Sequence, residues 1–252
     1  MSAEKAAQSL TAPVEDYLKA IFEIEAADVP GHQESAAAGT NEIAQALGIA
    51  PASVTGMLRR LADQGLIVYE RYRGVRLSDE GRRAALRTIR RHRIIEAYLT
   101  KALGYPWDRV HEEAERLEHA ASDELIDRMA SAIGEPTTDP HGAPIPSRDG
   151  TMDARPLLAL VDVAVGNIVR IRQVGDRDPE RLRYLAELGV TPGADVRVVA
   201  REPFGGPITL QIVREGSEAS RTAGRTRDDR ERAIGPTLAA QVFVETRRKR
   251  EA

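Results

Sequence analysis

The chain has 252 residues, with 42% hydrophobic and 30% charged residues, a composition typical of a globular protein of one to three modest domains. Its 36 Lys and Arg residues nearly balance 39 Asp and Glu residues, so the net charge neither requires nor excludes a polyanionic partner. With no cysteine, disulfides, iron–sulfur clusters and thiolate metal sites are excluded. The first ten residues lack the apolar core of a signal peptide, and no apolar run approaches the ~18 residues of a membrane span, so we expect a cytoplasmic protein with no membrane partner.

The first third of the chain predicts a helix-turn-helix followed by a wing. Residues 14–26 have the apolar stripe of an amphipathic helix, and Thr40 and Pro51 begin two further helices separated by a turn at Gly48. Residues 66–78 then predict two short strands around a turn. The candidate DNA contacts lie on the second helix of the pair and on the wing: Ala50, Pro51, Ser53, Thr55, Arg59, Arg60, Arg71, Arg73 and Arg76.

Charge is strongly segregated along the chain. Residues 40–93 contain eleven Arg against five acidic residues, whereas residues 107–127 contain eight acidic residues against two Arg. A basic segment of this kind attracts DNA phosphates without regard to base sequence, so it indicates DNA binding and leaves the operator unspecified. The alternative for residues 40–63 is an ordinary helical hairpin with a solvated basic turn.

The acidic segment also contains histidines at helical spacing. Glu115, Glu118 and His119 stand at i, i+3 and i+4, so a helix would place them on one face, with His111 one turn earlier. A long predicted helix over residues 79–103 carries the further i, i+4 pair of His92 and Glu96. Together these groups could bind two hard or borderline divalent ions, whereas each residue alone would be read as a solvated or core side chain. We assign no role to His32 and His141, which lie in predicted loops.

The second half of the chain predicts a proline-rich linker and a small β domain. Five prolines fall between residues 135 and 156 with almost no apolar periodicity, which indicates a domain boundary. The later segments NIVRIRQV, ADVRVVA, PITLQIV and LAAQVFVE are rich in Val and Ile and predict strands. Residues 214–232 are charged and rich in Gly, Ser and Thr, so we expect a disordered loop there. The predicted fold class is mainly α with a β domain.

Several long motifs resemble the diphtheria toxin repressor family of metal-dependent transcription regulators, especially its manganese transport regulator branch. They are VEDYLKAIFEI, PASVTGMLRRL, YERYRGVRLSDEG, RRHRIIEAYL and VHEEAERLEHAASDE. The resemblance covers residues 13–133 and the C-terminal β domain. It implies a winged helix-turn-helix over residues 1–78, a helical metal-binding and dimerisation domain over 79–140, the linker over 141–156 and an SH3-like domain, similar to the iron-transport accessory domain, over 157–252.

The resemblance also implies the metal ligands. Its primary site would use Asp16, Glu115, Glu118 and His119, and its second site would use His92, Glu96 and His111. Asp178 or Glu180 of the β domain would donate further ligands. Asp16 and Glu115 replace the Met and Cys typical of the iron-responsive branch, and their oxygen donors favour Mn²⁺, with Fe²⁺ as the alternative. The chain departs from the short manganese regulators at Lys19, where they carry a Glu.

The function implied is a manganese(II)-dependent repressor that binds a palindromic DNA operator as a homodimer and controls metal homeostasis. Leu99, Leu103, Leu117, Leu125 and Ile126 would supply the apolar dimer face. The alternatives are an iron(II)-dependent repressor of the same family, a regulator with an organic effector, and a two-metal hydrolase. We expect no enzyme, because the sequence has no GxSxG, no HExxH and no phosphate-binding glycine loop.

Overall fold

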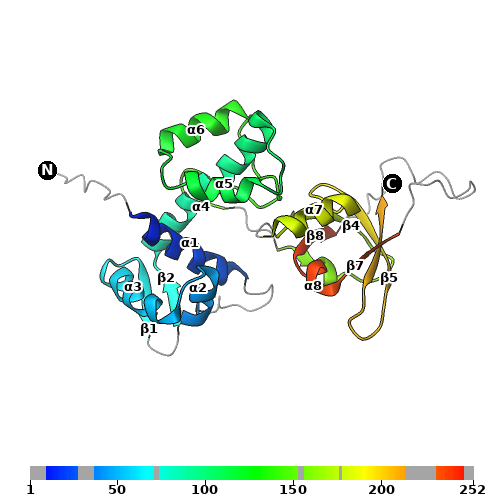
Figure 1. Ribbon diagram of the computed structural model, residues 1–252, viewed down its shortest axis with the longest axis horizontal. Helices are drawn as coiled ribbons and strands as arrows, with labels where there is room; N and C mark the ends of the chain where they lie inside the picture. Colours follow the sequence, from blue (N-terminus) through cyan, green and yellow to red (C-terminus); the bar gives the residue numbers. More distant parts are fainter. Residues whose placement is uncertain are drawn as a thin grey trace, which may run out of the picture. The chain divides into compact units, whose positions relative to one another are not determined.

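The computed structural model, drawn in Figure 1, describes residues 10–27, 37–70, 74–152, 156–175, 178–213 and 231–246. The chain divides into two compact units. The first unit takes in residues 1–92, 116–123 and 146–152, and the second takes in residues 93–115, 124–145 and 153–252. Each unit is described by itself. No helix in the described ranges is long and apolar enough to cross a membrane.

The first unit contains the predicted helix-turn-helix and wing. Helices α1 (Ala12–Ala27), α2 (Thr40–Ala46) and α3 (Pro51–Asp63) precede an antiparallel pair of strands, β1 (Ile67–Glu70) and β2 (Gly74–Leu77). Gly48 has a φ of +65° in the turn between α2 and α3, a conformation that glycine adopts without the steric cost of a Cβ atom. A bridge between Ala38 and Val75 adds the segment before α2 to the wing.

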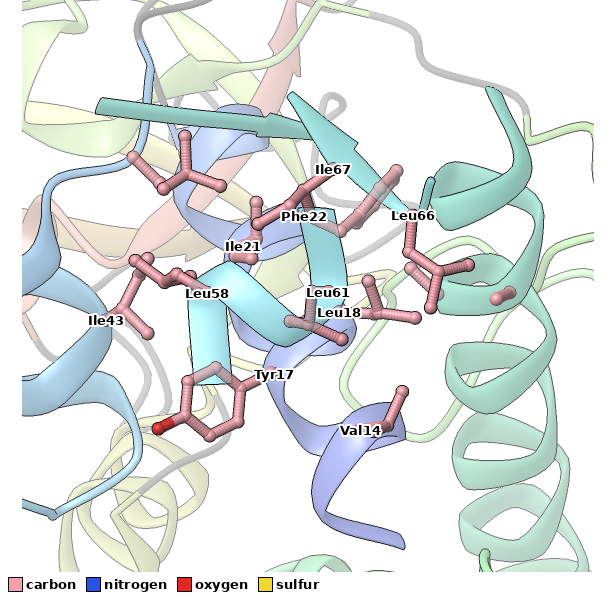
Figure 2. Close-up of a cluster of buried hydrophobic side chains, with 14 of the residues drawn as sticks. Val14, Tyr17, Leu18, Ile21, Phe22, Ile43, Leu58, Leu61, Leu66 and Ile67 are labelled. Atoms are coloured by element: carbon pink, nitrogen blue, oxygen red, sulfur yellow. The ribbon is translucent and has the colours of Figure 1, made fainter. Parts of the chain in front are cut away.

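One apolar core holds these elements together (Figure 2). Helix α1 contributes one face, and α2, α3 and the start of β1 close around it. The fully buried side chains of this core include Leu18, Ile21, Ile43, Leu58 and Leu61. Because the apolar residues of α1 recur at helical spacing, its opposite face is left to polar side chains, among them Glu15, Asp16 and Lys19.

Three helices follow the wing. Helix α4 (Asp79–Leu103) passes through both units, and α5 (Val110–Leu117) and α6 (Asp123–Ala132) come after it. Helix α5 ends at Leu117, whose carbonyl accepts hydrogen bonds from the amides of Ala120 and Ala121. Glu118 and His119 therefore lie in a turn, and the prediction that one helical face carries Glu115, Glu118 and His119 is wrong.

The C-terminal β domain contains a six-stranded antiparallel sheet, which agrees with the predicted fold class. The strand order is β3 (Leu158–Ala159), β8 (Val242–Thr246), β4 (Ile168–Val174), β5 (Asp195–Arg201), β6 (Ile208–Val213) and β7 (Arg232–Ile234). The short 3-10 helix η1 (Leu160–Asp162) and helices α7 (Pro179–Leu188) and α8 (Pro236–Ala239) complete this domain. Its core consists mainly of Val, Leu and Ile side chains from both sheet and helices.

Three details of this domain differ from the sequence prediction. Helix α7 was not predicted, because a ten-residue amphipathic segment between strands gives a weak periodic signal. Leu238 and Ala239 belong to α8, so the predicted strand over LAAQVFVE starts later, at Val242. Arg232 begins β7, whereas residues 214–230 of the predicted loop lie outside the described residues.

The proline-rich segment has little regular structure but makes specific contacts. In the first unit, the carbonyl of Pro146 accepts a hydrogen bond from Arg90. In the second unit, the amide of Val174 donates to the carbonyl of His141. Gly142 has a φ of +89°, and a Cβ atom there would lie 1.8 Å from the carbonyl oxygen of Arg172, so only glycine fits this approach to β4. The exact domain boundaries stay a prediction.

Candidate metal centre

Three of the four residues predicted for the primary site meet in the first unit. Asp16 lies on α1, and Glu118 and His119 lie in the turn after α5. One ligand atom from each of them falls within 4.8 Å of the others. His119 Nε2 is 2.8 Å from Asp16 Oδ1 and 3.5 Å from Glu118 Oε1. Two carboxylates and an imidazole at this separation fit a hard or borderline divalent ion, and Glu118 is fully buried.

Glu15, which the sequence prediction omitted, fixes the orientation of His119. Glu15 Oε2 is 2.6 Å from His119 Nδ1. A carboxylate can only accept, so Nδ1 donates and Nε2 is directed at Asp16 and Glu118. Burial lowers the pKa of His119, but the hydrogen bond to Glu15 and the charges of Asp16 and Glu118 outweigh burial, and the net pKa is raised. Nε2 is therefore the nitrogen of His119 that could bind a metal ion together with Asp16 and Glu118.

Lys19 is also part of this cluster. Its side chain is 10% exposed, and its Nζ lies 3.1 and 3.0 Å from the two carboxylate oxygens of Glu118. Nζ is also 3.2 Å from Nδ1 of His92. The sequence signal was present, because Lys19 follows Asp16 by three positions and so shares its face of α1. The structure thus places a fixed positive charge against one of the predicted ligands.

Glu115 contacts a residue of the predicted second site. In the second unit, its Oε1 is 3.8 Å from Nε2 of His111, one turn earlier on α5. His111 Nδ1 is in turn 3.4 Å from Oε1 of Glu96 on α4. The contact between His111 and Glu96 joins two residues of the predicted second site. Glu115 was predicted for the primary site but contacts His111 of the second site. Glu115 belongs to the second unit, whereas Asp16, Glu118 and His119 belong to the first.

A fully polar cluster that the sequence did not reveal is buried in the second unit. Glu96, Asp139 and His141 have exposed fractions of 0%, 6% and 0%, and one ligand atom from each lies within 4.8 Å of the others. His141 Nε2 is 2.8 Å from the carbonyl oxygen of Trp107, which can only accept, so Nε2 carries a hydrogen. His141 Nδ1 then faces Glu96 Oε2 at 3.7 Å.

His141 was given no role because it lies in a loop with no helical or strand spacing to a partner. Of the other two members of this cluster, Glu96 lies far away in the sequence on α4, and Asp139 is held by hydrogen bonds within the same loop as His141. Asp139 Oδ1 accepts hydrogen bonds from the amides of His141 and Ala143, so it shapes the loop and presents Oδ2 to Arg93 Nε at 3.6 Å. Glu96 faces two histidines, His111 through Oε1 and His141 through Oε2.

The remaining predicted ligands have other contacts. His92 Nδ1 lies 2.5 Å from Glu118 Oε2 in the first unit. Asp178 caps the start of α7, where its Oδ1 accepts from the amides of Glu180 and Arg181. Glu180 is exposed on the first turn of that helix. Within the described ranges, neither Asp178 nor Glu180 falls in a group of three potential ligands.

The candidate DNA contacts are placed on the surface of the first unit. Pro51, Ser53, Arg59 and Arg60 are exposed on α3, as is Ala50 just before it, and Thr55 is half-buried. Arg76 is exposed on β2. Arg71 and Arg73 lie outside the described residues. The inward face of α3, formed by Val54, Leu58 and Leu61, belongs to the core, so the polar face is available to a groove.

Comparison with known proteins assigns all three regions. Residues 9–75 match the family described as iron dependent repressor, N-terminal DNA binding domain, and residues 78–147 match iron dependent repressor, metal binding and dimerisation domain. Residues 158–246 match the FeoA domain.

Individual relatives extend over most of the chain. It is 30% identical to the iron-dependent repressor IdeR of Mycobacterium tuberculosis (strain H37Rv) over 79% of this chain and 87% of that protein. It is 36% identical to the HTH-type transcriptional regulator MntR of Lysinibacillus sphaericus over 38% of this chain and 68% of that protein. A solved manganese-dependent transcriptional repressor in complex with manganese matches with a TM-score of 0.79 and 36% identity, covering 92% of this chain and 99% of that one.

Proposed function

The chain belongs to the iron-dependent repressor family of metal-dependent transcriptional repressors, and on this premise we propose that it is a manganese(II)-dependent regulator that binds DNA when the Asp16 centre is loaded. The observation that carries the proposal is the meeting of Asp16, Glu118 and His119 across 103 positions of sequence. As a family member of this kind it acts by binding and not by catalysis.

The donor set supports manganese as the ion. Asp16 and Glu118 supply oxygen, His119 supplies an imidazole nitrogen, and the chain has no cysteine. Such ligands suit Mn²⁺ better than they suit ions that prefer soft sulfur ligands. The relative affinities of the ions and their supply in the cell also govern which ion is bound. Iron(II) takes the same ligands and is the second candidate, which the IdeR relative favours. When bound, the ion would add a divalent positive charge beside that of Lys19, which already contacts Glu118.

The ligands themselves explain how metal binding would reach the DNA interface. Asp16 is on α1, which packs its apolar face into the core that also holds α3. Glu118 and His119 come from the turn after α5. A metal ion held by all three residues would tie Asp16 of α1 to Glu118 and His119, so loading the centre would stabilise one placement of α1 and shift the population toward it. The DNA-competent arrangement is the one that the loaded centre selects.

A second ion is proposed at Glu96. The geometry favours Asp139 and His141 as its companions, while the predicted set of His92, Glu96 and His111 shares only the Glu96 carboxylate with it. Because this cluster is buried in the second unit, its role would be to stabilise the loop that contains His141. Asp178 and Glu180 remain as predicted contributors from the β domain.

The DNA target is proposed to be a palindromic operator bound by a homodimer. Two copies related by a twofold axis would present two α3 helices to half-sites spaced by whole helical turns. Of the predicted dimer residues, Leu99 and Ile126 are buried within the chain, whereas Leu103, Leu117 and Leu125 are 58%, 38% and 46% exposed. The last three are therefore the residues that remain available to a second copy.

The test is DNA binding by chelator-treated protein to its own upstream region, titrated with Mn²⁺, with Fe²⁺ under anaerobic conditions, and with Zn²⁺. We expect binding at lower free Mn²⁺ than free Fe²⁺, and loss of this response in Asp16→Ala and Glu118→Ala. Glu124→Ala is the matched control, because Glu124 is an exposed carboxylate paired with Arg128 on α6. Metal-independent binding would reject the proposal, and a lower threshold for Fe²⁺ would reassign the ion.

A further inference from the structure

The side chain of Lys19 occupies a position in the metal centre that a cation would take. Its ammonium nitrogen is within 3.0 to 3.2 Å of two carboxylate oxygens and one imidazole nitrogen, those of Glu118 and His92. The two oxygens of the Glu118 carboxylate are ligands that a hard or borderline metal ion also binds, whereas His92 Nδ1 donates to Glu118 Oε2 at 2.5 Å. Lys19 thus pairs with a carboxylate that also belongs to the group of Asp16, Glu118 and His119.

Glu118 joins the two positions. It is fully buried, it contributes an oxygen to the group with Asp16 and His119, and both of its oxygens contact Lys19. A carboxylate can bridge two cations, so these contacts are compatible with one ion on the Asp16 side and the ammonium on the His92 side. The same contacts exclude a second metal ion at the position of the Lys19 ammonium, because that ion and the ammonium would overlap and repel each other.

A structural ion pair does not by itself account for this arrangement. A buried pair is often no more stabilising than apolar residues of similar volume, because both charges are removed from water. The lysine must also keep its charge within reach of a divalent ion, and two positive charges a few ångströms apart repel in a medium of low dielectric constant. Lys19 therefore has an energetic effect on metal binding whatever it contributes to the fold.

We propose that Lys19 is a tethered cation that substitutes for a second metal ion, which limits this centre to one divalent ion and raises the metal concentration needed to load it. The inference rests on the proposed metal site. It goes further because it states how many ions the site binds. It also attributes the metal concentration needed to load the site to Lys19, which is not a ligand.

The experiment measures manganese binding to the full chain by equilibrium dialysis and by electron paramagnetic resonance. In the wild type we expect this centre to give the spectrum of an isolated ion. Lys19→Met should tighten the first binding step by about tenfold or more, because one repulsive charge is removed. Lys19→Glu should bind one more ion per chain than the wild type, and the two ions should be exchange-coupled because they would lie ~4 Å apart.

Two further variants keep the test independent of folding. Lys19→Arg retains the charge and should bind like the wild type, and Lys19→Gln replaces Lys19→Met if the latter does not fold. Lys101→Met is the matched control, because Lys101 is exposed on α4.

A coupled pair in the wild type would overturn the inference. So would unchanged stoichiometry and affinity in folded Lys19→Met (or Lys19→Gln) and Lys19→Glu. If the wild type binds no manganese at all, the proposed function itself fails, and that result is distinct from either of these.

Discussion

Glu15 Oε2 lies 2.6 Å from Nδ1 of His119, a residue 104 positions later in the chain. The contact joins the outer face of α1 to the turn after α5, and it sets which nitrogen of His119 faces Asp16. A carboxylate on the far nitrogen of a metal-binding histidine fixes the ring and strengthens it as a ligand. Glu15 is itself oriented by Arg91, whose guanidinium is 3.2 Å from Oε1.

Glu15→Gln should weaken manganese binding to this centre by about 10- to 100-fold, the usual effect of removing such a partner. The amide keeps the shape of the side chain but loses the charge that favours the Nδ1–H tautomer. Isothermal titration with Mn²⁺ would measure the change, with Glu124→Gln as the control on an exposed carboxylate. Wild-type affinity in Glu15→Gln would show that His119 is oriented by other contacts.

Glu118→Leu should destabilise the metal-free protein by about 3–5 kcal/mol, because Lys19 would stay buried without its carboxylate. The double variant Lys19→Met, Glu118→Leu should recover most of this loss, since it removes both charges together. Urea unfolding in the presence of a chelator would measure both. If the double variant is as unstable as the single one, the loss arises from packing around Glu118 and not from the charge of Lys19.

The raised pKa of His119 predicts how metal-free stability depends on pH. The group binds its proton more tightly in the folded than in the unfolded protein. Its stabilising contribution is therefore fully present below the unfolded pKa of about 6.5 and is lost as the pH rises through the higher folded pKa. Chelator-treated wild type should lose more stability across this interval than His119→Gln. Parallel pH profiles for the two proteins would contradict the assignment.

Arg59→Ala should weaken DNA binding about equally for all sequences. An exposed arginine on α3 that contacts a phosphate displaces roughly one counterion, so its removal should lower the slope of log affinity against log salt by about 0.9. Binding measured at several salt concentrations with saturating manganese would give the slope. Arg128→Ala, an exposed arginine on α6, is the control. A change confined to one base position would instead indicate base readout by Arg59.

Local patterns in the sequence were sufficient for most of the fold. The apolar spacing of α1, the Gly48 turn and the Val- and Ile-rich strands are signals carried by near neighbours, and the structure follows them. Ligand atoms of Asp16, Glu118 and His119, which the resemblance implied as metal ligands, lie within 4.8 Å of one another, and metal binding by them stays a prediction. The predicted continuation of one helix was wrong, since α5 ends at Leu117, before Glu118 and His119.

The contacts between distant side chains were decided only by tertiary structure. Glu15 against His119, Lys19 against Glu118, and His141 against Glu96 join residues from different elements, and His141 comes from a loop with no periodicity. Spacing in a sequence specifies which side chains share a face of one helix or strand. It carries no information about which faces of separate elements meet, because that depends on how their apolar surfaces pack and on which polar groups are buried together as a result.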